Sequence, residues 1–244
     1  LYCKINKRYF ELKVKKKILL LIGNKNVGSK ILKKLKSYSF LDIEILTSDK
    51  SFNKKGIKFL ENKKQFFLIL NNKKKFDFLI SVYWPWLVPK NLFSRFKDSI
   101  NFHPSYLPVA RGFYPHVHAI IKNLKWGVSL HKISDGIDKG NIWCQKKIIF
   151  NEFSSSTSLY KKGEKEIVKL FNKNFIKIFT GKIKSKQQSG RATYFSKSSI
   201  NKFDQLKLNK SYKLKDLIKL NNARTFKNKS FNFFNYKNEK YNFK

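Results

Sequence analysis

The chain of 244 residues contains no methionine and only two cysteines, Cys3 and Cys144. Two cysteines so far apart form neither a disulfide framework nor a metal-ligand motif, so the sequence predicts no metal site. No run of about 18 apolar residues occurs, so we expect no membrane-spanning helix. The basic first stretch lacks the apolar segment of a signal peptide, which favours a cytoplasmic protein. Because the chain begins with Leu, we expect a trimmed or partial sequence.

Acidic residues are scarce as well. Fifteen Asp and Glu stand against 54 Lys and Arg, which gives a formal net charge of +39. Such a charge is typical of proteins that bind nucleic acids or other polyanions. Only five of the 54 are Arg, however, and Arg is the residue that usually clamps phosphates and bases. A coding bias towards Lys and Asn explains the composition equally simply, so both interpretations stay open.

Histidine and proline are rare, and they are concentrated in one window. The chain has four histidines and five prolines. All of them lie between residues 85 and 131, and the histidines are His103, His116, His118 and His131. A lysine-dominated chain thus places its chemically specific residues in one short region. We expect the functional site there.

Short apolar runs alternate with stretches of helical periodicity. This pattern predicts an α/β fold, an open Rossmann-like and mostly parallel sheet with flanking helices. The expected strands are 17–23, 42–49, 66–70, 76–84, 99–103, 127–133 and 141–150, and the expected helices are 24–40, 116–126 and 154–179 with Ser156 or Thr157 as the cap of the last. Residues 23–30 nearly match a phosphate-binding loop, but the final Ser and Lys are exchanged. We interpret this stretch as a plain strand-to-helix turn.

Three regions follow from these patterns. Residues 1–16 form a basic N-terminal extension, residues 17–185 the main domain, and residues 186–244 a small C-terminal region. Polar residues mark the boundary before the last region. Beyond the polar stretch lie a short amphipathic piece and an aromatic end, which predicts a β-hairpin that turns at residues 237–239.

The stretch NFHPSYLP carries the first candidate chemistry. Asn101 and His103 are two residues apart on an expected strand, so their side chains point to the same side. In an open α/β sheet, reactive groups lie at the carboxyl ends of strands, where Pro104 stops this one. The loop 134–140 adds the acids Asp135 and Asp138 to a chain with few acids. An amide, an imidazole and a carboxylate together make an acid/base set with an oxyanion donor, in which the carboxylate keeps His103 protonated.

The ordered pieces N-F-H-P-S-Y-L-P, R-G, G-V-S-L-H and D-G-I-D-K-G-N-I resemble the folate-dependent formyltransferase family. The resemblance covers residues 17–180 and is densest between 99 and 145. It implies that the formyl donor is 10-formyltetrahydrofolate, that no metal is needed, and that Asn101, His103 and Asp138 are catalytic. It implies a tetrahedral intermediate whose oxyanion Asn101 and His103 stabilise, while Asp138 helps to move a proton.

The resemblance also implies binding residues. Those expected at the folate cofactor are Trp86, Leu87, Val88, Ser134, Asp135, Gly136 and Ile137. Those expected at the substrate are Arg111, Gly112, Tyr114 and His131. A role in the core remains open for Trp86 and is favoured for Trp84. His116 and His118 match nothing that the family requires, so we interpret them as helix or rim residues.

The acceptor is expected to be the amine of a nucleotide-linked amino sugar. The short tail with its A-R-T-F piece resembles that of nucleotide-sugar N-formyltransferases. A methionyl-tRNA formyltransferase usually reads H-A-S where this chain has H-P-S, and it carries a larger C-terminal barrel. That enzyme remains an alternative, as does a non-catalytic polyanion-binding module on the same fold. A homodimer is also left open.

Overall fold

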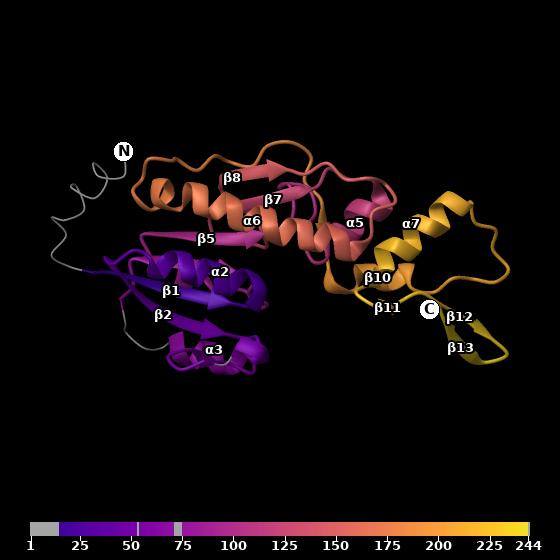
Figure 1. The fold of residues 1–244 in the computed structure, drawn as a ribbon, viewed down its shortest axis with the longest axis horizontal. Coiled ribbons are helices and arrows are strands. Elements are labelled where there is room, and N and C mark those ends of the chain that lie inside the picture. The colour runs from indigo at the N-terminus through magenta and orange to yellow at the C-terminus, as the bar shows by residue number, and fades with distance from the viewer. Residues whose placement is uncertain (1–14, 53, 71–74, 244) are drawn as a thin grey trace.

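A seven-stranded sheet forms the centre of the computed structural model, which describes residues 15–52, 54–70 and 75–243. Its strand order is β3-β2-β1-β4-β5-β7-β8 (Figure 1). The strands are β1 (Lys16–Ile22), β2 (Leu41–Thr47), β3 (Lys58–Phe59), β4 (Phe78–Val82), β5 (Asp98–His103), β7 (Gly127–His131) and β8 (Ile142–Lys147). The first five in chain order are parallel, whereas β7 and β8 pair antiparallel. The predicted fold class is confirmed.

Helices cover both faces of this sheet. On β1, Ile18, Leu20 and Ile22 join one apolar cluster, whereas Leu19 and Leu21 join the other. Such a strand, buried on both faces, needs helices on each side. The first cluster packs under α2 (Lys25–Lys36), α5 (Pro115–Lys122) and α6 (Ser156–Phe179), and the second under α3 (Lys63–Leu70) and α4 (Lys90–Phe93). A short 3₁₀ turn, η1 (Lys50–Phe52), follows β2.

The stretch 66–70 is helical, so its prediction as a strand is wrong. The side chain of Asn62 accepts a hydrogen bond from the backbone N–H of Gln65 and so caps the first turn of α3. Only one side of the helix is buried, because Phe66 is fully enclosed while Leu68 is 71% exposed. A run of apolar letters this short does not separate the two structures.

The turn after β1 is the predicted strand-to-helix connection. Asn24 caps α2 by accepting a hydrogen bond from the Val27 N–H. The cap of α6, in contrast, is Ser155, whose hydroxyl accepts from the Ser158 N–H. The prediction of Ser156 or Thr157 was thus one or two residues too late, because several serines in a row offer equivalent caps.

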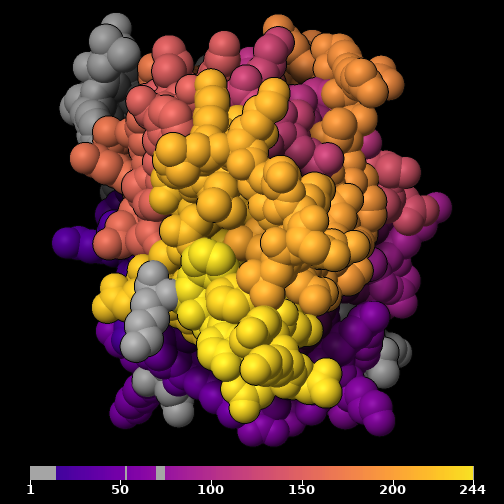
Figure 2. All heavy atoms as spheres, turned by 90° about the vertical axis from the view of Figure 1, so that its right-hand side faces the viewer, coloured from indigo at the N-terminus to yellow at the C-terminus, as the bar shows by residue number. Residues whose placement is uncertain are grey.

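The C-terminal region is built from short elements that pack against the end of α5. They are β9 (Tyr194–Phe195), η2 (Lys197–Phe203), α7 (Leu214–Arg224), β10 (Thr225–Phe226), β11 (Lys229–Ser230), β12 (Phe233–Tyr236) and β13 (Glu239–Asn242). The two last strands form the predicted hairpin, with Lys237 and Asn238 at positive φ in its turn. Arg224 and Asp204 form a buried ion pair inside the region. Seen from this end, the C-terminal segment covers the centre of the molecule (Figure 2).

The start of this region also pairs with the main body of the chain. Lys186 exchanges two backbone hydrogen bonds with Ile142 at the start of β8. Strand β9 pairs with β6 (Arg111–Gly112), which lies in the middle of the chain. The expected extension 1–16 lies outside the described residues except for Lys15 and Lys16. Among the residues that the structure describes, no helix is long and apolar enough to cross a membrane.

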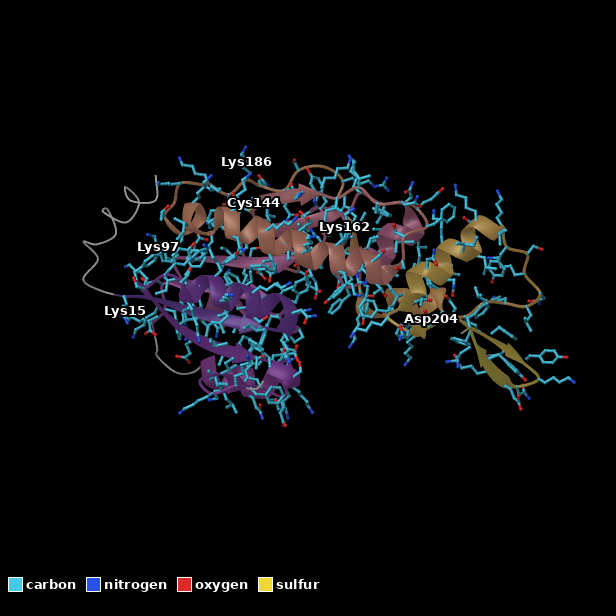
Figure 3. All side chains as sticks on the ribbon, viewed as in Figure 1. Lys15, Lys97, Cys144, Lys162, Lys186 and Asp204 are labelled. Carbon is cyan, nitrogen blue, oxygen red and sulfur yellow. The ribbon has the colours of Figure 1, made fainter. Side chains whose placement is uncertain are left out.

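Lysines project from many separate elements. The labelled Lys15 and Lys97 lie at the left-hand end of the molecule, whereas Lys186 lies at its top and Lys162 near its middle (Figure 3). This spread fits a coding bias as well as it fits polyanion binding.

Candidate active site

Strand register places three polar side chains in one row. Ser81 on β4 lies opposite Asn101 on β5, which in turn lies opposite His131 on β7. Within β5, Ile100 and Phe102 face the apolar cluster, so Asn101 and His103 share the other face, as predicted. The Nδ2 atom of Asn101 lies 3.0 Å from Nε2 of His131.

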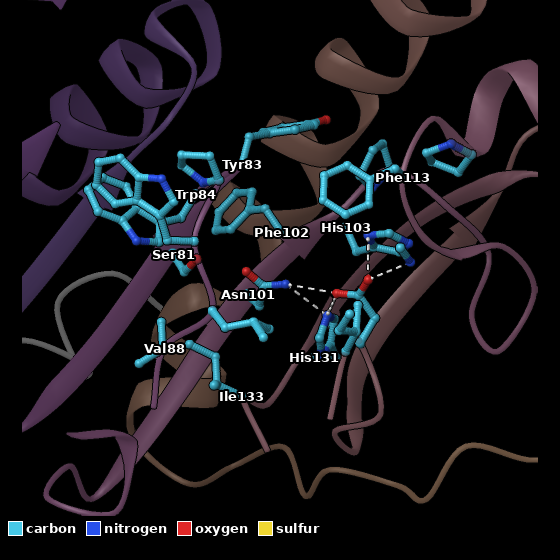
Figure 4. Close-up of a pocket in the computed structure, with 18 of the residues that line it drawn as sticks. Ser81, Tyr83, Trp84, Val88, Asn101, Phe102, His103, Phe113, His131 and Ile133 are labelled. Atoms are coloured by element: carbon cyan, nitrogen blue, oxygen red, sulfur yellow. Dashed lines mark hydrogen bonds and ion pairs between the residues drawn. The ribbon is translucent and has the colours of Figure 1, made fainter. Parts of the chain in front are cut away.

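Asp138 joins this row from the loop between β7 and β8. The loop folds back over β5, because Lys132 ion-pairs with Asp98 and the Ile133 N–H bonds the Ser99 hydroxyl. The carboxylate of Asp138 then reaches two strand residues. Its Oδ2 lies 3.4 Å from Nδ1 of His103, and its Oδ1 lies 3.3 Å from Nδ2 of Asn101 (Figure 4). The structure therefore brings the three predicted catalytic side chains together.

The surroundings of Asp138 stabilise its charge. Burial by itself would raise the pKa of the carboxyl, but positive charge on His103 or His131 and the Gly112 N–H, which donates to Oδ2 at 2.9 Å, lower it, and the result is a pKa below the ordinary value. Asp138 is therefore ionised at neutral pH.

His103 is neutral in this arrangement. Its Nε2 lies 2.9 Å from the Ala110 carbonyl oxygen, which only accepts, so this nitrogen carries a proton. Burial is the largest influence on the pKa of His103 and lowers it below 6.5, although Asp138 acts in the opposite direction. Asp138 therefore acts on His103 in the predicted direction, but burial outweighs it, so a protonated His103 stays a prediction. Nδ1, which faces Asp138, has a free lone pair.

The amide of Asn101 has a defined orientation. Nδ1 of His131 lies 2.7 Å from the Lys132 carbonyl oxygen, which only accepts, so this nitrogen carries a proton, whereas Nε2 faces the Asn101 amide nitrogen, which only donates. The Asn101 amide nitrogen donates to this Nε2 and to Asp138. Its oxygen lies on the side away from Asp138 (Figure 4).

These side chains line a cavity of about 490 Å³. Twelve of the fourteen residues predicted for the site lie on its wall: Trp86, Leu87, Val88, Asn101, His103, Gly112, Tyr114, His131, Ser134, Gly136, Ile137 and Asp138. The other two do not. The side chain of Asp135 is exposed. The guanidinium of Arg111 donates to Gln188 Oε1 instead, from Nη2 at 2.7 Å and from Nε at 3.1 Å. The sequence pattern places a residue in a loop but does not say which way its side chain points.

The wall also includes residues that sequence reasoning did not select. They are Ser81, Tyr83, Trp84, Pro85, Phe102, Pro104, Phe113, Pro115, His116, Ile133 and Tyr160. Trp84 and Trp86 also pack against the second apolar cluster, so each is both a core and a cavity residue. His116 lies at the start of α5 and reaches the cavity, whereas His118 stacks on Phe195 with ring centres 3.7 Å apart. Of these, Pro85, Pro104, Pro115 and His116 belong to the window of histidines and prolines that the sequence singled out.

Four buried polar atoms on the wall have no hydrogen-bond partner within the described part of the chain. They are Tyr83 Oη, Trp84 Nε1, Ser134 Oγ and His116 Nδ1. A buried polar atom without a partner costs free energy, so such atoms indicate a ligand that pairs with them. Trp84 and Ser134 accompany the apolar Leu87, Val88 and Ile137. Apolar walls with a few polar atoms suit a flat heteroaromatic ring.

The cavity wall differs from the rest of the surface in its content of basic residues. None of the described residues that line it is Lys or Arg, although the chain has 54 of them. In the described segments, no group of three or more His, Cys, Asp or Glu side chains is arranged to hold a metal ion.

Comparison with known proteins places these residues in a family. The sequence profile described as "Formyl transferase" matches residues 17–174. A methionyl-tRNA formyltransferase of Coprothermobacter proteolyticus is 34% identical over 124 residues, which are 50% of this chain and 41% of that protein. A dTDP-4-amino-4,6-dideoxyglucose formyltransferase of Mycobacterium tuberculosis is 32% identical over 87 residues, 36% of this chain and 37% of that one. The matches thus span about two fifths of these relatives.

Solved structures match over nearly the whole chain. A 4-N formyltransferase from Francisella tularensis has a TM-score of 0.85 at 26% identity, and the match covers 93% of this chain and 96% of that one. A methionyl-tRNA formyltransferase from Clostridium thermocellum has a TM-score of 0.63 at 18% identity, and the match covers 92% of this chain and 90% of that one. At that identity the second match shows a shared fold alone.

Proposed function

Because the chain belongs to the formyl transferase family, we propose that it transfers a formyl group from 10-formyltetrahydrofolate to the amine of a nucleotide-linked amino sugar. One observation carries the proposal. Asp138, from a loop distant in sequence, places its carboxylate 3.3 Å from Asn101 and 3.4 Å from His103 of strand β5, on the wall of one cavity. Such a convergence of an amide, an imidazole and a carboxylate suits acyl transfer.

The cavity fits a folate donor. Trp86, Leu87 and Val88 provide apolar contact for a pterin ring, and Ser134 Oγ and Trp84 Nε1 offer the hydrogen bonds that they lack within the protein. The backbone around Gly136 and Ile137 completes this part of the wall. The bound donor supplies an electrophilic formyl carbon. These residues hold and orient it next to Asn101.

His103 and Asp138 manage the proton of the reaction. An amine that attacks a formyl carbon becomes positively charged and must lose a proton before the bond to the donor nitrogen breaks. The free lone pair on Nδ1 of His103, beside the ionised Asp138, is placed to accept it. The resulting imidazolium is stabilised by the carboxylate, which also holds the ring orientation. The same proton then returns to the leaving nitrogen.

Asn101 is proposed to donate to the formyl oxygen as charge develops there, and the positive charge of the nearby imidazolium adds to this stabilisation. In the resting state the Asn101 amide donates to His131 and Asp138. Redirecting one of these N–H groups to the formyl oxygen gives the donor expected from the sequence. Gly112, Tyr114 and His131 stay proposed substrate residues. Arg111 does not, because Gln188 holds it away from the cavity.

The shape of the cavity favours a sugar as acceptor. Tyr83, Phe113, Tyr114, His116 and Tyr160 give its wall rings that suit the apolar faces of a pyranose. The absence of Lys and Arg from the described lining leaves a phosphate group to the outside, where lysines are abundant. The small C-terminal elements and the fit to the 4-N formyltransferase support the same choice over a tRNA acceptor.

The test is turnover with 10-formyltetrahydrofolate and a panel of nucleotide-linked amino sugars, with formylmethionyl-tRNA formation as the competing assay. We expect formylation of a sugar amine by the wild type and a loss of at least about 100-fold in His103→Ala. Unchanged turnover in that variant would contradict the assignment. Preferential formylation of charged initiator tRNA, measured at several salt concentrations, would favour the alternative.

A further inference from the structure

Gln188 lies in the segment between α6 and β9, beyond the residues that the family profile matches. Its side chain makes four hydrogen bonds. Nε2 donates to the backbone oxygens of Asp138 at 2.7 Å and Gly140 at 2.8 Å. Oε1 accepts from Nη2 of Arg111 at 2.7 Å and from Nε at 3.1 Å. This one amide therefore connects the loop of Asp138 to the strand β6.

The chemistry of the partners determines how the amide is turned. A guanidinium can only donate, and a backbone carbonyl can only accept. The amide oxygen of Gln188 must therefore face Arg111, and its nitrogen must face the loop. Replacing either half of the group breaks one side of the bridge and leaves the other.

Both chain segments that Gln188 joins hold the catalytic carboxylate. Asp138 has a φ of +51°, in the left-handed region that costs most residues about 1–2 kcal/mol and that Asp and Asn tolerate better, so contacts within the loop help to keep it there. Gln188 binds the carbonyl of this residue. On the other side, Gly112 follows Arg111 directly and donates its N–H to Oδ2 of Asp138.

We propose that Gln188 is a positioning residue, which fixes Asp138 so that its carboxylate stays within reach of Nδ1 of His103. The inference rests on the proposed function for its effect on turnover. The geometric part of it concerns the electrostatic environment of His103 and is measurable without any substrate.

Two substitutions separate the parts of the bridge. Gln188→Met keeps the length and volume of the side chain but removes all four hydrogen bonds. Gln188→Glu keeps the acceptor for Arg111 and removes the donor to the Asp138 loop. The matched control is Gln187→Met, because Gln187 is the exposed neighbour of the same type.

The first readout is the titration of the His103 imidazole by NMR, assigned with His103→Gln. The carboxylate of Asp138 raises the pKa of His103, so a displaced Asp138 lets it fall further. We expect a lower pKa in Gln188→Met than in wild type and Gln187→Met. The same His103 pKa in wild type, Gln188→Met and Gln187→Met would overturn the inference, whether or not formyl transfer is found.

The second readout is the split between kcat and KM. A carboxylate displaced by about 1 Å lowers turnover by roughly 10- to 100-fold. We expect this loss in kcat for both Gln188 variants, with little change in KM for the acceptor. If Gln188→Met does not fold, Gln188→Glu decides, and wild-type kcat there overturns the proposal. Absence of turnover in the wild type would instead count against the proposed function.

Discussion

Nδ1 of His103 lies 3.4 Å from Oδ2 of Asp138, and the same oxygen accepts the Gly112 N–H at 2.9 Å. Three segments that are distant in sequence are thereby fixed around one carboxylate oxygen. Because both ring and carboxylate are largely buried, their interaction is weakly screened by solvent. Small changes in this geometry are therefore expected to have measurable effects.

Asp138→Asn is predicted to lower kcat by about 100- to 10,000-fold, because the amide still accepts the Gly112 N–H but carries no charge to support a protonated His103. The pKa of His103, already lowered by burial, falls further when the carboxylate is removed. Steady-state kinetics and NMR titration measure the two effects. The control is Asp135→Asn in the same loop, whose side chain is exposed and outside the cavity. A similar loss of activity in both variants would refute the assignment.

Gly112→Ala is predicted to destabilise the protein by about 1–3 kcal/mol more than Gly190→Ala. Both glycines have nearly the same φ, +87° and +90°, so the strain that Ala meets from φ is similar at the two positions. A Cβ at Gly112 would lie 2.3 Å from the Phe195 carbonyl oxygen, whereas at Gly190 nothing lies within 4 Å. The clash separates β6 from β9 and disturbs the N–H that holds Asp138. Urea unfolding of the two variants gives the difference, and equal stabilities would contradict the packing described.

His116→Gln is predicted to reduce the loss of stability in acid. Burial lowers the pKa of His116 from 6.5 to about 3 in the folded protein. A lowered histidine pKa means that the unfolded chain binds the proton more readily, so the folded state loses stability as the pH falls below 6.5. Between pH 7 and pH 5 this one group accounts for about 2 kcal/mol.

Urea unfolding at the two pH values measures that difference between wild type and variant. Both proteins keep His103 and His118, whose pKa values are lowered by burial as well, so their contributions cancel in the comparison. A wild type and a variant that lose the same stability on acidification would show that His116 is not buried as described.

Folate binding is predicted to quench tryptophan fluorescence through the cavity. Of the four tryptophans, Trp84 and Trp86 line it, whereas Trp126 and Trp143 are in the core with their N–H groups bonded to backbone oxygens. Trp86→Phe should therefore remove much of the quenching by a stable folate such as 5-formyltetrahydrofolate. Trp143→Phe is the control that should leave it. Quenching that persists in Trp86→Phe and is lost in Trp143→Phe would show that the folate binds outside this cavity.

The predictions that succeeded depended on local order in the sequence. Asn101 and His103 share one face of a strand because side chains alternate, and Pro104 ends that strand. The hairpin at the C-terminal end follows from the same kind of short-range pattern. The stretch 66–70 failed because its burial, not its composition, decides between helix and strand.

Sequence alone determined the class of the fold and the three side chains proposed to act, two of which lie in the window of histidines and prolines. Tertiary structure decided which way each loop side chain points, and so left Arg111 and Asp135 outside the cavity and brought in Tyr83 and His116. It also decided the neutral state of His103 and the partners of Gln188. Burial and contacts between distant segments set these properties, and neither is encoded in the spacing of neighbouring residues.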